Sequence, residues 1–173
     1  EDHLDATSAP TLTNKRFEDE LTGDIKGVRI GIPEEYMNTD LEPAIKGVLE
    51  GSIEKLRKLG AEIVPVSLPH TKLALAVYYV IMPAEVSSNI ARLDGIRYGV
   101  EADEERENLF DTYRQNRKQG LGREVERRIM LGTYALSAGY YDAYYGKAQK
   151  VRELIRQDFR AAFEQVDVLF TPT

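Results

Sequence analysis

The sequence predicts an α/β fold in which helices flank a small, mixed but mostly parallel sheet. Short β-rich runs at residues 28–32, 63–66 and 166–170 support this prediction. An amphipathic segment joins the first two runs, and a strand, a helix and a strand within about forty residues are typical of a parallel βαβ unit. Because a long helical stretch separates the second run from the third, we also expect a helical insertion.

The βαβ unit covers residues 25–67. Asp40 can cap its helix, and Pro43 is tolerated in the first turn because the amide hydrogen that it lacks would have no intrahelical partner there. Apolar residues recur at helical spacing until Gly60, which is expected to end the helix. Pro65 cannot donate to a sheet ladder, so the second strand is expected at a sheet edge, a strand end or a bulge.

The helical region covers residues 70–165. Residues 73–80 are apolar on nearly all sides and are expected to be deeply buried. Pro83 is expected to break or kink this helix, with a second helix from about residue 84 to 93. The strongly charged stretch at 101–119 predicts an exposed helix.

Two further helices, at about 124–137 and 140–163, precede the third strand in residues 166–173. Residues 1–24 lack a sustained period and predict an extended lead-in. We therefore expect residues 1–173 to form a single α/β domain. Because three strands are few for so many helices, we expect this domain to be a fragment of a larger protein.

The composition excludes several kinds of site. The 173 residues include no cysteine, so disulfides, thiolate metal sites and cysteine nucleophiles are excluded. A formal net charge of −6 argues against a nucleic-acid surface, although basic residues cluster between positions 114 and 128. We expect no apolar run to approach the ~20 residues of a membrane span.

The residues themselves reveal no catalytic motif. The two histidines, His3 and His70, have no neighbours that mark them as bases, and both are expected to play local surface roles. A Gly-x-Ser-x-Gly elbow, a Ser-x-x-Lys motif and a phosphate loop are absent. No His, Asp and Glu residues have the spacing of metal ligands, so no metal site is predicted.

Two residue pairs are candidates for binding. Tyr78-Tyr79 lies in an apolar helix, where buried hydroxyls need partners, and either core aromatics or ligand contacts fit this pattern. Arg127-Arg128 directly precedes apolar residues, so at least one guanidinium is expected near the buried boundary. Such a group suits a carboxylate, which either a substrate or a structural Asp or Glu could supply.

A set of tyrosines follows the arginine pair. Either an aromatic ligand site or amphipathic packing of one helix on another fits their spacing. The residues are Tyr134, Tyr140, Tyr141, Tyr144 and Tyr145.

Seven blocks of the sequence are recognisable together. They are residues 5–8, 27–36, 59–62, 66–71, 83–89, 94–99 and 127–151, and the last two are the most specific. The last contains the runs Arg-Arg-Ile-Met-Leu-Gly-Thr and Gly-Tyr-Tyr-Asp-Ala-Tyr-Tyr. In these blocks the whole chain closely resembles the amidase signature family, and within it the glutaminase subunits of the tRNA-dependent amidotransferases.

The resemblance implies part of the amidase signature fold and a glutaminase chemistry. In this family a Ser–cis-Ser–Lys triad hydrolyses glutamine. The ammonia passes to a partner subunit, which uses ATP and Mg to convert Glu-tRNA(Gln) to Gln-tRNA(Gln), or Asp-tRNA(Asn) to Asn-tRNA(Asn). The resemblance therefore implies a cytoplasmic carbon–nitrogen ligase of the translation apparatus, a heterotrimer that engages tRNA without a membrane. It implies no cofactor bound by this chain itself.

The resemblance assigns no catalytic residue to this chain. The Gly/Ser-rich signature and the upstream lysine of the triad are absent from the sequence. Ser87-Ser88 lies in a predicted helix without glycines or a matching lysine, and we reject it as a substitute. The isolated chain is therefore expected to be inactive.

What the resemblance does assign is glutamine binding, by Tyr79 and Arg128. Tyr78 and Arg127 are the alternatives one residue away. The arginine would hold the α-carboxylate of glutamine, and the acidic partner of the α-amino group would lie beyond Thr173.

Two other functions stay open. The chain could belong to an amidase that acts on another amide without a tRNA partner, or to a non-catalytic α/β module used for binding or assembly. The charged stretch at 101–119 could serve a partner surface in either case, or be a solvated face.

Overall fold

The computed structural model describes residue 4 and residues 16–37, 41–103 and 107–173. In chain order its main elements are β1 (Arg29–Pro33), α1 (Glu34–Met37), α2 (Pro43–Lys58), β2 (Glu62–Val66), α3 (Ala74–Ile90), α4 (Leu109–Gly120), α5 (Arg123–Leu136), α6 (Lys147–Gln165) and β3 (Val168–Leu169). The predicted lead-in at 1–24 lies largely outside the described residues, and within its described part Phe17–Glu20 forms a short 3-10 helix.

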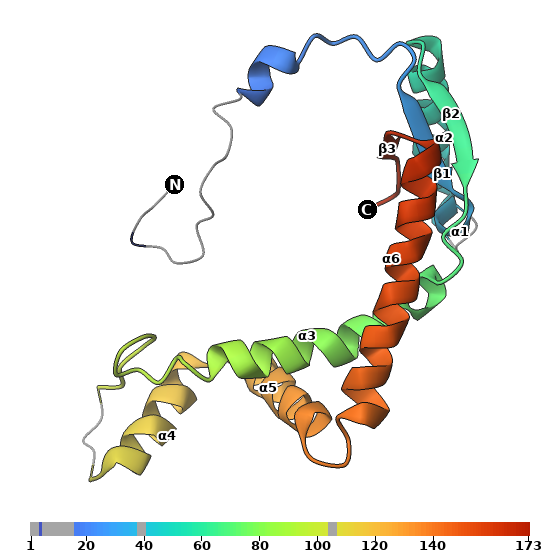
Figure 1. Cartoon of the computed structure of the whole chain (residues 1–173). Helices are drawn as coiled ribbons and strands as arrows, with labels where there is room; N and C mark the ends of the chain where they lie inside the picture. Colours follow the sequence, from blue (N-terminus) through green and yellow to red (C-terminus); the bar gives the residue numbers. More distant parts are fainter. Residues whose placement is uncertain (1–3, 5–15, 38–40, 104–106) are drawn as a thin grey trace.

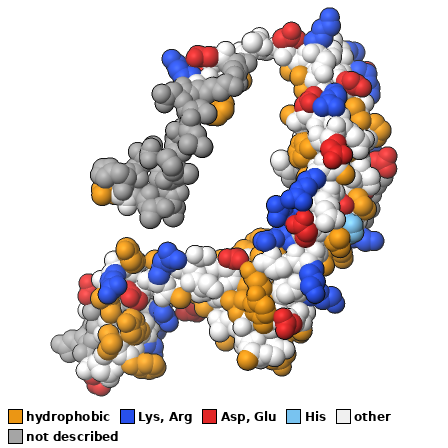
Figure 2. All heavy atoms as spheres, viewed as in Figure 1, with side chains coloured by type: hydrophobic (Ala, Val, Ile, Leu, Met, Phe, Trp, Pro, Cys, Tyr) orange, Lys and Arg blue, Asp and Glu red, His pale blue; other side chains and the backbone are white. Residues whose placement is uncertain are grey.

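The elements follow an open arc (Figure 1). The sheet and α2 lie at one end, α6 runs along the arc, and α3, α5 and α4 continue to the other end. Hydrophobic side chains gather on the surface over α4 and α5 (Figure 2). The chain therefore exposes apolar surface that a closed α/β domain would cover.

The sheet contains three described strands in the order β2-β1-β3, and both pairings are parallel. The three predicted strands are confirmed, although β3 is shorter than the predicted run at 166–170. Pro65 lies in β2, at the edge of the described sheet, where the missing amide hydrogen leaves no ladder bond unmade.

Helix α2 connects the first two strands as predicted, and Pro43 is its first residue. Gly60 follows the helix with a φ of +94°, a conformation that residues with a β-carbon rarely adopt. The predicted helix end at Gly60 is therefore confirmed. The predicted cap, Asp40, lies outside the described residues.

One hydrophobic core holds the sheet against α6. Its buried members are Val66, Leu68, Ala162 and Val166. A β-carbon on Gly31 of β1 would come within 2.9 Å of the Val166 side chain and 2.7 Å of the Leu169 side chain. Only glycine leaves room for this packing at the centre of the sheet.

Helix α3 runs without interruption from Ala74 to Ile90. The predicted break at Pro83 and the separate helix at 84–93 are therefore wrong. A proline inside a helix removes one backbone hydrogen bond, but Pro83 and Ala84 are buried where α5 packs on α3. Tertiary packing therefore outweighs the local preference of proline.

The expected deep burial of residues 73–80 is also wrong. Val77 packs with Ile81 and with Ala148 of α6, whereas Leu75 and Tyr79 expose 67% and 51% of their surface. A helix that is apolar on all sides is fully buried only when partners surround it. In the described chain α5 and α6 contact α3 and leave part of it uncovered.

The remaining helices match their predictions in part. The exposed helix predicted at 101–119 is confirmed only for α4, and the Asn108 side chain caps it by accepting from the Asp111 amide at 2.9 Å. The helix predicted at 124–137 corresponds to α5. The helix predicted at 140–163 begins as a π-helical turn, Asp142–Gly146, before α6.

One described stretch, Thr71–Ile90, has the length and composition to cross a membrane, with a mean hydropathy of 1.3. The expectation that no apolar run approaches the length of a span is therefore wrong for this stretch. A single helix of this kind is weak evidence for a membrane protein, because core helices of soluble proteins share these properties. Here the helix packs on α5 and α6.

Candidate functional site

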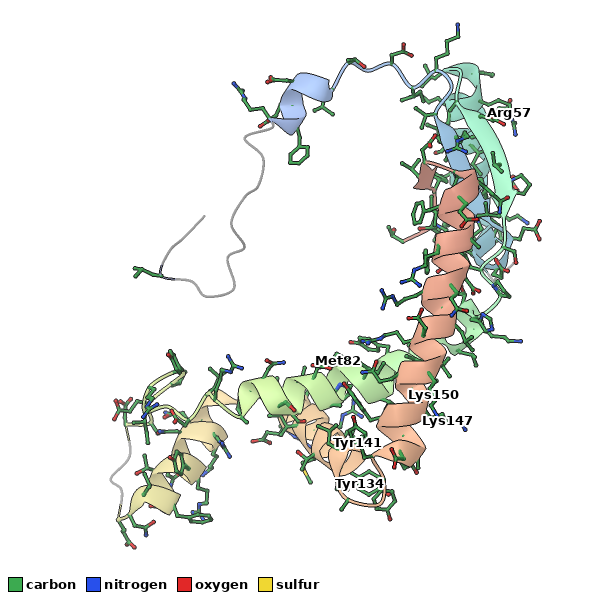
Figure 3. The ribbon with its side chains drawn as sticks, viewed as in Figure 1. Arg57, Met82, Tyr134, Tyr141, Lys147 and Lys150 are labelled. Carbon is green, nitrogen blue, oxygen red and sulfur yellow. The ribbon has the colours of Figure 1, made fainter. Side chains whose placement is uncertain are left out.

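A polar cluster joins α5 to α3 around Arg128. The Nε group of Arg128 donates to Oε1 of Glu124 at 2.7 Å, and Nη1 donates to the Tyr78 hydroxyl at 3.1 Å. Nη1 also lies 3.7 Å from the sulfur of Met82, which Figure 3 labels on α3. The hydrogen bond to Glu124, followed by that to Tyr78, raises the pKa of Arg128 above its usual value, so the guanidinium stays charged.

Glu124 binds both arginines of the pair. Nε and Nη2 of Arg127 each donate to its carboxylate at 2.9 Å. The hydrogen bonds from Arg127 and then Arg128 lower the pKa of Glu124 to about 2, so its carboxylate is ionised at neutral pH. The Arg127 side chain is 62% exposed and that of Arg128 is 28% exposed. The arginine predicted at the buried boundary is therefore Arg128.

Sequence reasoning missed Glu124. The signal was present, because Glu124 lies three and four residues before the two arginines, and side chains at these spacings are neighbours on a helix.

Tyr78, rather than Tyr79, is the tyrosine whose hydroxyl contacts Arg128. The two tyrosine rings meet edge to face with centroids 5.3 Å apart, and Tyr79 lies within electrostatic reach of Arg127. Consecutive helical residues point about 100° apart, so only one of the pair can face Arg128 directly. The role assigned to Tyr79 stays a prediction.

The five tyrosines near the turn between α5 and α6 form two groups, and Figure 3 labels Tyr134 and Tyr141 there. The Tyr134 and Tyr140 ring centroids are 4.4 Å apart, and their hydrogen bond raises the pKa of Tyr134 to about 12. In the second group the Tyr145 hydroxyl donates to Glu85 of α3 at 2.8 Å. These contacts within the turn and to α3 favour the packing interpretation.

Comparison with known proteins decides the family. The sequence matches the amidase family over residues 1–173. The chain belongs to the amidase family. It is 56% identical over 172 residues to the A subunit of glutamyl-tRNA(Gln) amidotransferase from Chloroflexus aggregans, and this alignment covers 99% of the chain and 35% of the relative. The chain thus spans about a third of the length of the curated relatives that it matches.

Solved amidase structures share the fold. The crystal structure of the A subunit of glutamyl-tRNA(Gln) amidotransferase from Thermotoga maritima superposes with a TM-score of 0.58 at 36% identity, over 89% of this chain and 28% of that one. A bacterial aryl acylamidase of the amidase signature family superposes with a TM-score of 0.62 at 16% identity, over 91% and 29% of the two chains. The predicted fold class, part of the amidase signature fold, is confirmed.

Two serines of this amidase chain, Ser87 and Ser88, have the chemistry of a nucleophile. Both hydroxyls donate to the carbonyl oxygen of Ala84 within α3, at 2.8 and 3.2 Å. A serine nucleophile needs a base that accepts its proton, and none of the described bonds supplies one. The geometry therefore supports their rejection as triad residues.

His70 has a structural partner in this amidase fold. Its backbone amide donates to Oδ2 of Asp158 at 2.8 Å, and its Nδ1 lies 2.9 Å from Oδ1. The other histidine, His3, lies outside the described residues. Within the described ranges no group of three or more His, Asp and Glu side chains is arranged to hold a metal ion.

Proposed function

We propose that this chain is part of the glutaminase subunit of a tRNA-dependent amidotransferase and that Arg128 binds the α-carboxylate of glutamine. The placement of Arg128 carries this proposal. Its side chain is 28% exposed and its guanidinium is held by Glu124 and Tyr78, while its Nη2 group has no hydrogen-bond partner among the residues that the structure describes. A guanidinium in this state suits a carboxylate, because it combines full charge with directed N–H donors.

The amidotransferase subunits that the chain resembles, at 53 to 57% identity, support the substrate class. In the proposed enzyme a Ser–cis-Ser–Lys triad elsewhere in the parent protein hydrolyses glutamine. A partner subunit of the heterotrimer uses the ammonia, ATP and Mg to amidate Glu-tRNA(Gln), Asp-tRNA(Asn) or both in the cytoplasm. This chain contributes scaffold and substrate-binding residues and holds no cofactor, so alone it is inactive.

The second binding residue comes from the tyrosine pair, and the geometry favours Tyr78 over the expected Tyr79. The Tyr78 oxygen accepts a hydrogen bond from Arg128, which leaves its own proton available to a ligand. An N–H donor of Arg128 and the O–H donor of Tyr78 would then lie side by side. A single carboxylate could accept from both.

The test is an Arg128→Gln variant of the intact parent subunit in complex with its partner subunits. Loss of a charge-assisted contact of about 2 kcal/mol would raise the KM for glutamine about thirtyfold. Arg123→Gln, at the first position of the same helix, controls for the change in charge. An unchanged KM in Arg128→Gln would contradict the assignment.

The same assay separates the alternatives. A wild-type complex that hydrolyses another amide but not glutamine would support an amidase of different specificity. A complex that hydrolyses no amide would support a non-catalytic module.

A further inference from the structure

We infer that Glu124 is a positioning residue for substrate binding: its carboxylate accepts two hydrogen bonds from Arg127 and one from Arg128, and it orients Arg128 so that the Nη2 end of the Arg128 guanidinium faces the ligand. The inference rests on the proposed function of Arg128. The resemblance assigned binding roles only to the Tyr78-Tyr79 and Arg127-Arg128 pairs, and it assigned none to Glu124.

The hydrogen bonds of Glu124 distinguish the two arginines. Arg127 donates through both Nε and Nη2, which is the bidentate arrangement that best neutralises a guanidinium. Arg128 donates to the same carboxylate through Nε alone. Glu124 thus binds the Nε group of Arg128, and the two terminal nitrogens of Arg128, Nη1 and Nη2, stay available to other partners.

The opposite side of Arg128 is held by α3. Nη1 donates to Tyr78 and contacts the sulfur of Met82, so the guanidinium is restrained between two helices. The hydrogen bonds to Glu124 on one side and to Tyr78 on the other then limit rotation of the guanidinium about the bonds of the Arg128 side chain. A guanidinium fixed in this way loses less conformational entropy when a ligand binds.

The charges of the cluster favour the binding of one anion. Arg127 and Arg128 carry two positive charges and Glu124 carries one negative charge, so the group has one unit of positive charge in excess. One substrate carboxylate balances it. Without Glu124 the excess would double, and Coulomb attraction alone would then strengthen the binding of an anion.

Positioning and attraction therefore predict opposite effects of the same substitution, which makes the inference testable. Glu124→Gln is made in the intact parent subunit with its partner subunits. If Glu124 positions Arg128, the KM for glutamine rises about tenfold, as for one lost charge-assisted hydrogen bond, and kcat changes little. If Glu124 acts only through its charge, KM falls.

Two matched variants sharpen the result. Glu124→Asp keeps the charge but shortens the side chain by one methylene. Positioning therefore predicts a raised KM for glutamine, whereas a purely charge-based role predicts an unchanged KM. Glu126→Gln makes the same charge change two residues away on α5, and it is expected to leave KM at the wild-type value. Thermal unfolding of each variant shows whether it is folded.

A second substrate separates positioning of Arg128 from a general effect on the site. In the amide of glutamine, an uncharged carboxamide replaces the α-carboxylate. The effect of Glu124→Gln on the KM for this analogue should be absent or small. If Glu124→Gln changed the KM for both substrates equally, or left the KM for glutamine unchanged or lower, the inference about Glu124 would be overturned. The proposed function of Arg128 would not be affected. A wild-type complex that hydrolyses no glutamine would overturn the proposed function and the inference with it.

Discussion

The carbonyl group of Pro83 in α3 packs directly against Gly132 of α5, and a β-carbon on Gly132 would overlap that carbonyl. Gly132 lies one turn after Arg128, and Pro83 follows Met82, which contacts Arg128. The close approach of the two helices therefore sets the spacing of the groups that hold the guanidinium. Both the fold of this region and the candidate site depend on a glycine at this position.

A Gly132→Ala substitution should accordingly destabilise the parent subunit, by about 1–3 kcal/mol for an overpacked contact. It should also raise the KM for glutamine, because α5 must move away from α3. Gly47→Ala in α2 is the matched control, since its added β-carbon meets nothing within 4 Å. It should stabilise by about 0.5–1 kcal/mol through helix propensity. Urea unfolding measures the free energy of unfolding of both variants. Equal stability of Gly132→Ala and wild type would contradict the packing argument.

The tyrosine pair can be resolved with two conservative substitutions. Tyr78→Phe removes the hydroxyl that lies 3.1 Å from Nη1 of Arg128 and should raise the KM for glutamine several-fold, in line with about 1 kcal/mol for one hydrogen bond. Tyr79→Phe should have the smaller effect. Steady-state kinetics of the intact complex compares them, and the reverse order would return the role to Tyr79.

The contact between Asp158 and His70 links α6 to the segment between β2 and α3. The Asp158 side chain is 9% exposed and accepts from the backbone amide of His70 at 2.8 Å. Asp158→Ala leaves that amide without its acceptor and should cost about 1–3 kcal/mol of unfolding free energy. Glu164→Ala, on the exposed side of α6, is the control. A stability loss no greater than that of the control would show that the link is dispensable.

The stability of the sheet should depend on pH through Asp167. Its carboxylate accepts from the Arg29 backbone amide, Nε and Nη2, and the side-chain hydrogen bond to Arg29 is the main cause that lowers the pKa of Asp167 below 3.8. A lowered folded-state pKa gives stability that is present above pH 3.8 and is lost as the pH falls through the folded-state pKa.

The Tm difference between wild type and Asp167→Asn should therefore be largest near neutral pH and should shrink at about pH 2. Arg29→Gln should behave in the same way, because it removes the other side of the pair. A Tm difference that stays constant across this range would rule out the link between Asp167 ionisation and stability.

The parts of the fold that the sequence predicted well are those with local causes. The strands around Ile30, Val64 and Val168, and the end of α2 at Gly60, follow from β-rich runs and from glycine conformation. The continuity of α3 through Pro83 has a non-local cause, since it depends on packing with α5. The π-helical turn at Asp142–Gly146 has no sequence signature that periodicity could detect.

The candidate site was predictable only in outline. The position of Arg128 next to apolar residues indicated partial burial, and its side chain is indeed the less exposed of the pair. The choice between Tyr78 and Tyr79 depends on how α3 rotates against α5, which a sequence does not reveal. The burial of Leu75 was overestimated because the composition of a helix does not show how many partners surround it.

The order of strands in the sheet has a consequence for biosynthesis. The central strand β1 is synthesised before its neighbour β3, which lies nearly 140 residues later, as the separation of 138 residues between Arg29 and Asp167 shows. During translation β1 can pair with β2 as soon as residues 62–66 have emerged, whereas its edge toward β3 stays open until residue 169 leaves the ribosome. An unpaired strand edge invites association with other chains. Until β3 is made, the nascent chain therefore exposes a free edge of β1 to association with other chains.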